Sequence, residues 1–481
     1  MIRAYSVADV RTAEGRAMNG TADGLLMQRA AAALAVTVAE LLPSGVYGAR
    51  VVLLVGAGNN GGDALWAGAR LAGRGARVDA VLVADAAHPE GLAALTAAGG
   101  RVRRGDGTDT RAALAGAHVV LDGVLGIGGR PGVSEVVERL LAAVPQDAVV
   151  VAVDLPSGVD PETGQTPAEH VWADVTVTFG LVKPGLLLPP ADQAAGQLRL
   201  VDIGLGPHLR GLTPALEQWE AADVAAAWPV PGPRDDKYSR GVLGVVAGGS
   251  TYTGAAVLCT GAAVRTGAGM VRYVGPQPPT DLVRARWPEV VPGPGRVQAW
   301  VVGPGLDPQA DEDQRDAALS ALGEDVPCLV DAGALSLLGE RTAPTLLTPH
   351  AGELARLLSA RGGEEVRRAD VEAAPLAHAR RAAETTRATV LLKGGTCVIA
   401  TPDGRVRTAP DGPGWLATAG SGDVLAGIAG ALLAAGLDPF DAAAMAVTVH
   451  GLAAPRANAG GPVPAEALVH ALPGTVAALL G

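Results

Sequence analysis

Residues 50–63 read Arg-Val-Val-Leu-Leu-Val-Gly-Ala-Gly-Asn-Asn-Gly-Gly-Asp, a continuous apolar run that ends in a glycine-rich turn. Continuous apolar runs of this length are typical of strands that are buried on both faces of a sheet. A helical pattern over residues 63–74 follows the turn. The stretch therefore predicts a strand, a tight turn and a helix, which is the first half of a βαβ unit in an α/β domain.

The same alternation of Val/Leu runs and Ala-rich helical segments continues along the chain. A Pro-rich, charged segment at 227–236 interrupts it and has the composition of a linker. We therefore expect two three-layer α/β domains, residues 1–218 and 219–481. The predicted strands are 50–56, 77–83, 118–125, 148–155, 174–179 and 198–203 in the first domain, and 242–247, 298–302, 327–331, 345–347 and 390–392 in the second.

Composition excludes several classes of protein. The 481 residues include 38 Lys and Arg against 49 Asp and Glu, so the net charge is 38 − 49 = −11. An acidic chain without a basic block is not expected to bind nucleic acid or an anionic membrane. Hydrophobic residues make up 48%, which argues against general disorder, and aromatic residues make up only 3%, which argues against binding by aromatic stacking.

Cysteine usage and the N-terminal sequence both predict a cytoplasmic protein. Cys259, Cys328 and Cys397 are far apart, with neither a CxxC pair nor zinc-ligand spacing, so we expect three reduced, buried thiols. Residues 1–20 lack the apolar core of a signal peptide. The longest apolar stretch, 424–437, is too short to span a bilayer.

The turn at 56–63 formally matches the GxGxxG fingerprint of NAD-binding domains, with Asp79 or Asp85 about twenty residues further on. Two carboxamides, Asn59 and Asn60, occupy positions that are usually small or apolar in that fingerprint. Asp63 would also face a bound pyrophosphate. A simple alternative for Asp63 is a helix N-cap. The motif favours a polar pocket at the carboxyl edge of the sheet.

Two further strand ends support this pocket. Asp122 is followed by a glycine-rich loop containing Arg130, and Asp154 is followed by Ser157. Glycine-rich loops allow backbone N–H groups to approach phosphates. Asn60, Asp122 and Ser157 offer only oxygen ligands and one carboxylate, which suits a monovalent hard cation. Asp63 and Asp154 remain as acid/base candidates.

Four motifs together resemble the NAD(P)H-hydrate epimerase domain: GNNGGD at 58–63, DGVLGIGGRPG at 122–132, DLPSGVD at 154–160 and TFGLVKPG at 178–185. The resemblance covers residues 1–215 and implies a Rossmann-like domain that interconverts the C6 epimers of the hydrated cofactor. It also implies that Asn60, Asp122 and Ser157 hold potassium. Ala57 and Ala64 depart from the family pattern. The implied substrate-binding residues are Asn59, Asn60, Gly61, Gly62, Asp63, Gly126, Ile127, Gly128, Gly129, Arg130, Pro131, Gly132 and Asp154.

The second domain carries polar turns after several predicted strands. Thr253-Gly254-Ala255 opens a helix, and Gly303-Pro304-Gly305 follows a strand. A lone His350 in a turn is more often structural, although a strand-end turn raises its functional interest. Residues 417–424, Ala-Thr-Ala-Gly-Ser-Gly-Asp-Val, present free N–H groups and Asp423 at the start of an apolar helix. A carboxylate placed there is a natural base for a phosphoryl-accepting hydroxyl.

TPHAGE at 348–353, LLKGGT at 391–396 and GSGDVLAGI at 420–428 resemble the ADP-dependent NAD(P)H-hydrate dehydratase domain, a ribokinase-like fold. The resemblance covers residues 219–481. It implies that ADP, with magnesium, phosphorylates the C6 hydroxyl, after which phosphate leaves more readily than hydroxide. Gly333 and Ala351 depart from the family pattern. The implied contacts are Ala255, Gly305, His350 and Asp423 with the hydrate, and Lys393, Gly394, Gly395, Thr396, Cys397 and Gly422 with the nucleotide, with Asp423 as the base.

The joint resemblance predicts a bifunctional repair enzyme whose partners are NADH-hydrate, NADPH-hydrate and ADP or AMP. We also expect a homo-oligomer. Two alternatives stay open at this stage. One is a ribokinase-like small-metabolite kinase with an attached cofactor-binding regulatory domain, and the other is a non-catalytic binding module.

Overall fold

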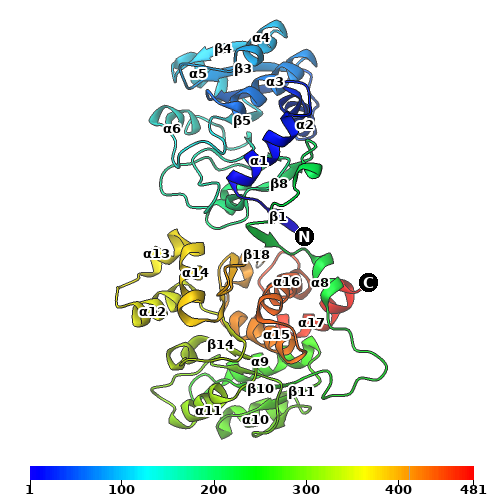
Figure 1. Ribbon diagram of the computed structural model, residues 1–481, viewed down its shortest axis with the longest axis vertical. Helices are drawn as coiled ribbons and strands as arrows, with labels where there is room; N and C mark the ends of the chain where they lie inside the picture. Colours follow the sequence, from blue (N-terminus) through cyan, green and yellow to red (C-terminus); the bar gives the residue numbers. More distant parts are fainter. Residues whose placement is uncertain (411) are drawn as a thin grey trace. The chain divides into compact units, whose positions relative to one another are not determined.

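A computed structural model describes residues 1–410 and 412–481 and divides into two compact units. One unit comprises Arg3–Ala215, drawn from blue to green in Figure 1. The other comprises Leu216–Gly481 together with Met1–Ile2. Both units are mixed α/β structures built on a sheet whose strands are mostly parallel, which confirms the predicted fold class.

The first unit contains a seven-stranded sheet in the order β4-β3-β2-β5-β6-β7-β8, and every neighbouring pair is parallel. The chain places β3 on one side of β2 and β5 on the other, so the strand order reverses between β2 and β5. Open α/β sheets bind ligands at such a reversal. The strands are β2 (Arg50–Val55), β3 (Arg77–Leu82), β4 (Arg101–Arg104), β5 (Val119–Gly123), β6 (Val149–Val153), β7 (Val175–Phe179) and β8 (Gln197–Val201).

Helices cover both faces of this sheet. Alternate side chains of a strand point to opposite faces, and in β2 Val51 and Leu53 pack in one core while Val52 and Leu54 pack in another. The first core includes residues of α1 to α4, and the second includes Leu114 of α5 and Leu140 of α6. The unit therefore has three layers. The helices are α1 (Val7–Met18), α2 (Leu25–Glu40), α3 (Asn59–Gly73), α4 (Pro89–Ala97), α5 (Thr108–Leu114), α6 (Glu135–Leu141) and α7 (Ala191–Ala195), with the 3-10 turns η1 (Pro184–Leu186) and η2 (Gly206–His208).

The second unit contains an eleven-stranded sheet in the order β1-β9-β18-β17-β16-β15-β14-β13-β10-β11-β12. All pairs from β16 to β12 are parallel, and β17 is antiparallel to both neighbours. The strands are β1 (Ile2–Ala4), β9 (Leu216–Gln218), β10 (Val242–Val246), β11 (Met270–Tyr273), β12 (Val291–Pro292), β13 (Ala299–Val302), β14 (Cys328–Val330), β15 (Thr345–Leu347), β16 (Thr389–Leu392), β17 (Thr396–Ala400) and β18 (Val406–Pro410).

One face of this sheet is covered by α9, α15, α16 and α17, which share a core with Leu243, Val301 and Leu391. Helices α11 and α14 also pack on the sheet, against β10 and β13 and against β16 and β17 respectively. The helices are α8 (Ala221–Ala227), α9 (Thr253–Thr266), α10 (Gln277–Arg286), α11 (Glu312–Gly323), α12 (Ala351–Gly362), α13 (Arg368–Ala373), α14 (Pro375–Thr386), α15 (Ser421–Ala434), α16 (Pro439–Ala457) and α17 (Ala465–Leu479), with the 3-10 turns η3 (Ala332–Leu337) and η4 (Gly414–Leu416). Within the described residues, no helix is both long enough and apolar enough to cross a bilayer.

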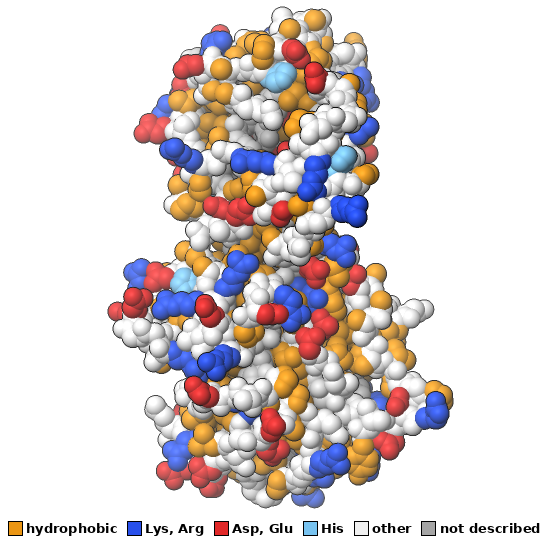
Figure 2. All heavy atoms as spheres, in the orientation of Figure 1, with side chains coloured by type: hydrophobic (Ala, Val, Ile, Leu, Met, Phe, Trp, Pro, Cys, Tyr) orange, Lys and Arg blue, Asp and Glu red, His pale blue; other side chains and the backbone are white. Residues whose placement is uncertain are grey.

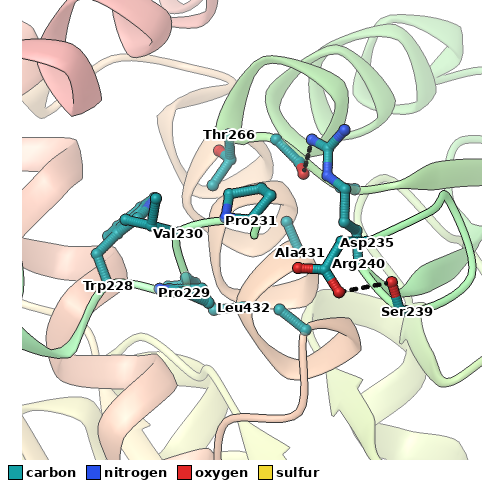
Figure 3. A pocket seen from close by; sticks show the side chains of 13 residues that line it. Trp228, Pro229, Val230, Pro231, Asp235, Ser239, Arg240, Thr266, Ala431 and Leu432 are labelled. Atoms are coloured by element: carbon teal, nitrogen blue, oxygen red, sulfur yellow. Dashed lines mark hydrogen bonds between the residues drawn. The ribbon is translucent and has the colours of Figure 1, made fainter. Parts of the chain in front are cut away.

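The Pro-rich segment after α8 lies against the carboxyl-terminal ends of α9 and α15. Trp228 to Pro231, together with Arg240, enclose a cavity of about 120 Å³ there (Figure 3). The Arg240 guanidinium donates to the carbonyl of Gly267 at 2.9 Å. On the side of α15 the cavity is lined by Ala431, Leu432 and Ala435, which lie about 12–18 Å along the helix from Asp423. It is therefore a structural pocket under the Pro-rich segment, separate from the start of α15.

Helices α9 and α15 approach each other closely at Gly427. A Cβ atom there would lie 2.3 Å from the carbonyl oxygen of Cys259. We expect Gly427→Ala to lower the free energy of unfolding of this unit by about 1–3 kcal/mol, because the helices must separate. The matched control is Gly474→Ala in α17, where a Cβ atom meets nothing within 4 Å. The control should be neutral or stabilising by up to about 1 kcal/mol. Urea denaturation of both variants measures the difference, and equal midpoints would refute the close packing.

Candidate active sites

The carboxyl ends of β2, β5 and β6 meet at one edge of the first sheet, and two neighbouring cavities of about 420 and 700 Å³ open there. The residues that line both cavities are Glu14, Asn59, Asn60 and Ile127. Asp63 and Asp154 line the smaller cavity. The larger one is bordered by the turn Gly56–Asn60 and by Gly126–Gly129. The polar pocket expected from the strand ends is therefore present.

Asp63 lies inside α3 and does not cap it. The helix begins at Asn59, with Gly58 as its N-cap, four residues earlier than the predicted start. The N-cap alternative for Asp63 is therefore wrong. The side chain is 6% exposed, and within the described residues its Oδ1 atom has no hydrogen-bond partner. Burial raises the pKa of Asp63 well above its usual value, and the nearby charges of Asp154 and Glu14 add to the effect.

Asp154 is held in a different way. Its backbone is in the left-handed region, with φ of 70°, which is uncommon for a residue other than glycine. The Lys183 ammonium, the Thr178 hydroxyl at 3.1 Å and the Phe179 N–H at 3.2 Å all donate to Asp154 Oδ1. The Lys183 side chain is 2% exposed, so this is a buried ion pair with hydrogen bonds from two further residues. The unusual backbone is therefore held by three contacts at the end of β6.

The predicted cation ligands lie together. The Ser157 hydroxyl donates to Asp122 Oδ1 at 2.6 Å, and the Asn60 amide donates to the carbonyls of Leu125 and Val153. Asp122 is fully buried and makes no ion pair with any described residue, and burial raises its pKa to about 6. An uncompensated buried carboxylate next to carbonyl oxygens is a donor set that suits a hard monovalent cation. Within the described chain, no cluster of three or more His, Cys, Asp or Glu residues could hold a metal.

The glycine-rich loop after β5 is divided between the cavity and the surface. Gly126, Ile127, Gly128 and Gly129 line the larger cavity. Arg130 and Pro131 are exposed, and Gly132 follows them with φ of 90°. The structure therefore brings the first half of the loop to the pocket, and binding by Arg130, Pro131 and Gly132 stays a prediction.

Two residues of this site, Lys183 and Glu14, were not predicted from the sequence to have a function. Lys183 was visible within a motif, and its position just beyond β7 placed it at the same sheet edge as Asp154. Glu14 lies on α1 and lines both cavities, and burial raises its pKa. No strand end or glycine motif marks Glu14, so no signal in the sequence pointed to it.

In the second unit, the start of α15 forms the centre of the other candidate site. The N-cap Gly420 has φ of 88°, a conformation that favours glycine, and its helix has no side-chain cap. Ser421 Oγ lies 3.0 Å from His450 Nε2 beneath the turn. Burial, with a contribution from Asp331, raises the pKa of Asp423 to about 7, while Lys393 opposes the shift. The helix start thus presents N–H groups beside a carboxyl that titrates near neutral pH.

Lys393 connects this helix start to the sheet. Its ammonium donates to Asp331 Oδ1 at 2.8 Å, and Thr348 donates to the same oxygen at 2.9 Å. A Cβ atom on Gly422 would lie 3.5 Å from Lys393 Nζ, so the ammonium is next to the first turn of α15. Burial opposes its charge, but Asp331, Glu353 and Asp423 together raise the pKa of Lys393. A cation is therefore fixed beside the predicted base.

His350 is the N-cap of α12, as the simple structural alternative expected. Its Nδ1 atom accepts from the N–H groups of Gly352 and Glu353, and Glu353 accepts from the His350 N–H at 2.9 Å. The other ring nitrogen, Nε2, lies 3.4 Å from Glu353 Oε1, and the His350 side chain is 51% exposed. Ala351 is the first residue of α12, so the missing proline does not prevent the helix from starting. His350 and Lys393 are bridge partners, which brings the turn to the same centre.

The other residues that the sequence assigned to the hydrate and to the nucleotide lie in two places. A Cβ atom on Gly305 would lie 2.4 Å from Cβ of Ala255, so these two predicted hydrate contacts adjoin. Gly394 and Gly395 form the turn between β16 and β17, whose first residues Thr396 and Cys397 are buried. At Gly333, which departs from the family pattern, a Cβ atom would lie 2.0 Å from the carbonyl oxygen of Leu306, so this backbone has no room for a side chain.

Comparison with known proteins supports the resemblance of each unit to its family. A family model described as NAD(P)H-hydrate dehydratase matches residues 243–473, and one described as YjeF-related protein N-terminus matches residues 24–185. The bifunctional NAD(P)H-hydrate repair enzyme Nnr of Mycobacterium tuberculosis is 48% identical over 458 residues, covering 92% of this chain and 91% of its own. This chain belongs to the bifunctional NAD(P)H-hydrate repair enzymes.

Relatives of the same name show the same full-length match. The repair enzyme of Mycobacterium leprae is 47% identical over 470 residues, covering 94% of this chain and 93% of its own. That of Corynebacterium glutamicum is 35% identical over 510 residues, covering 89% and 87%. These matches confirm the predicted bifunctional repair enzyme, and they favour it over the small-metabolite kinase and the binding module.

The structure predicts the titration of Asp423 in this repair enzyme. Its carboxyl should ionise with a midpoint near pH 7, because burial and Asp331 disfavour the charged form. Asp331→Asn should move the midpoint to lower pH, whereas Thr348→Val, which leaves both charges in place, should move it less. The measurement is the side-chain carbon shift in ¹³C-aspartate-labelled protein, assigned with Asp423→Asn. A midpoint near 4 in the unsubstituted protein would contradict the prediction.

Proposed function

We propose that residues 1–218 interconvert the C6 epimers of NAD(P)H-hydrate and that residues 219–481 dehydrate the S epimer with ADP. The observation that carries the dehydratase assignment is the position of Lys393 and the uncapped start of α15 beside Asp423. Together they offer a cation, free N–H groups and a base at one point. These are the groups that phosphoryl transfer to a hydroxyl requires.

In the proposed dehydratase step, Asp423 takes the proton of the C6 hydroxyl. The hydroxyl oxygen then bonds to the terminal phosphorus of ADP, and the bond to the leaving oxygen of AMP breaks. Lys393 and the N–H groups at the start of α15 stabilise the charge that develops on the transferred group. Magnesium bound with the ADP phosphates would supply further positive charge. Phosphate then leaves C6 and a proton leaves C5, which restores the C5–C6 double bond and gives NAD(P)H, AMP and phosphate.

In the proposed epimerase step, Asp63 is the acid and Asp154 is the charged partner. Asp63 is kept protonated by burial, so it can give its proton to the departing C6 hydroxyl, which leaves as water. The positive charge left on the ring faces Asp154, which Lys183 holds in place. Water then adds from the opposite face of C6 and returns a proton to a carboxylate. No atoms are gained or lost, and only the configuration at C6 changes.

We also propose that potassium binds between Asp122, Ser157, Asn60 and the carbonyl oxygens of Leu125 and Val153. These carbonyls accept from the Asn60 amide, and a cation there would be bound by the same oxygens after the amide rotates. The bound ion would balance the buried charge of Asp122 and fix the loop that borders the larger cavity. The homo-oligomer and the cytoplasmic location expected from the sequence stay predictions.

Two substitutions test whether the activities are separate. We expect Asp423→Asn to lower the rate of ADP-dependent NADH formation from S-NADH-hydrate by at least 100-fold, because the base is lost, while epimerisation is unchanged. Asp63→Asn should instead lower the rate of epimerisation and leave ADP-dependent NADH formation unchanged. NADH absorbance reports dehydration, and chromatographic separation of the epimers reports epimerisation.

The same assay tests the function itself. The unsubstituted protein should yield NADH and free phosphate. A stable phosphorylated product would instead indicate a kinase, and loss of both activities in either variant would refute separate sites.

Removal of potassium tests the cation site. Exchange of potassium for tetramethylammonium should weaken binding of the hydrate to an Asp423→Asn protein, which retains the first site, because the buried Asp122 then lacks a counter-ion. The KM for epimerisation, measured at constant ionic strength by chromatographic separation of the epimers, reports the affinity of the first site alone. Ser157→Ala should reduce the difference between the two salts, whereas Ser44→Ala, an exposed residue that lines neither cavity, should not. Equal affinity in both salts would remove the cation from the proposal.

A further inference from the structure

A separate cavity of about 570 Å³ lies in the second unit between η3 and α12. Its volume falls within the range that small-molecule sites usually have. Aliphatic side chains form much of its lining, and guanidinium groups stand on the α12 side. The residues that define it are Leu335 and Leu338 of η3 and the segment after it, and Arg356, Leu357, Ala360 and Arg361 of α12.

One end of this cavity adjoins the phosphoryl-transfer centre. Ala332 and Gly333 line it and directly follow Asp331, the partner of Lys393. Glu353 also lines it and bonds to the backbone of His350, which in turn is the bridge partner of Lys393. A substrate whose reacting hydroxyl lies at Asp423 can therefore extend past His350 into the cavity.

The sheet order separates this cavity from the predicted nucleotide loop. The cavity is formed by segments that follow β14 and β15, whereas the turn Gly394–Gly395 joins β16 to β17. Lys393 lies between the two, at the end of β16. The phosphoryl donor and its acceptor must approach the transferred group from opposite sides. The cavity is thus on the acceptor side.

The two arginines of the cavity differ in their contacts. Arg361 donates to the carbonyl of Leu338 at 2.7 Å and so braces the wall. Arg356 is exposed, and it forms no ion pair with any described residue. Its Nη1 atom lies near Gly352, beside the cap of α12. An unpaired guanidinium in a cavity with aliphatic side chains suits a phosphate that is linked through a sugar to a flat, uncharged ring.

We propose that this cavity binds the adenosine half of the hydrated dinucleotide and that Arg356 binds its pyrophosphate. The aliphatic side chains of Leu335, Leu338 and Leu357 contact the adenine ring. The proposal rests on the proposed dehydratase function and adds the part of the substrate that does not react. Because ADP occupies the other side of Lys393, the cavity discriminates between the two nucleotides.

The test uses full-length protein with two substrates, S-NADH-hydrate and the hydrate of reduced nicotinamide mononucleotide, which lacks the adenosine half. Ala360→Phe fills the cavity and should raise KM for the dinucleotide about tenfold or more, with KM for the mononucleotide and for ADP unchanged. Arg356→Gln should raise KM for the dinucleotide about tenfold, the effect of one lost charge-assisted contact. Arg381→Gln, which alters a half-exposed arginine on α14 that pairs with Glu364, is the matched control and should change neither KM.

Direct binding separates the two proposals. Calorimetry of S-NADH-hydrate without ADP should show two binding events in the unsubstituted protein, one for each unit, and Ala360→Phe and Arg356→Gln should each weaken only one of them. If the unsubstituted protein forms no NADH, the dehydratase proposal fails, and the binding measurement still tests the cavity. A rise in KM for ADP in place of the dinucleotide, or equal losses for the dinucleotide and mononucleotide in Ala360→Phe, would overturn the cavity assignment.

Discussion

Parallel strands that are buried on both faces can expose polar groups only at their ends, and right-handed crossovers bring all the carboxyl ends to the same edge. This constraint places Asp122 and Asp154 together in the first unit, although 32 positions separate them. In the second unit it brings Asp331 to Lys393, across 62 positions of chain. The helices that return from this edge begin there, so their free N–H groups face the same point. The chemistry of each unit follows from that edge.

Charges at such an edge are partly buried, and each unit stabilises them in two ways. Some carboxylates are paired with a lysine, as Asp154 is with Lys183 and Asp331 is with Lys393. Asp63 has no such partner in the described structure, and burial raises its pKa instead. A pair of carboxyls whose environments differ in this way supplies an acid and a charged partner at one pH. The asymmetry between Asp63 and Asp154 is thus a direct result of where Lys183 lies.

The sequence predicted the central parallel strands of both sheets and the strand-end motifs, because both reflect local burial. It missed β4, since Arg101–Arg104 is an edge strand with polar side chains and no apolar run. It also missed β11, β17 and β18 of the second sheet, which are short runs, and no helix separates β17 and β18 from β16 along the chain. It placed the start of α3 four residues late, because glycines and asparagines are poor helix formers whose helical state depends on the sheet edge. Glu14 could not be predicted, because only tertiary packing brings α1 to the cavities.

Both sites must attract polyanions to an acidic chain, and acidic and basic side chains are interspersed over the face shown in Figure 2. The attraction therefore has to be local, from backbone N–H groups at helix starts and from single cations such as Lys393 and Arg356. Such contacts act at hydrogen-bond distance, where salt screens them less than it screens a long-range field. The low aromatic content is consistent with the proposed adenine site, because the cavity next to α12 is lined by leucines and has no aromatic side chain among the described residues that line it. The choice of ligand in this enzyme then depends on the shape of the cavities at the carboxyl edge of each sheet and on a few charged side chains.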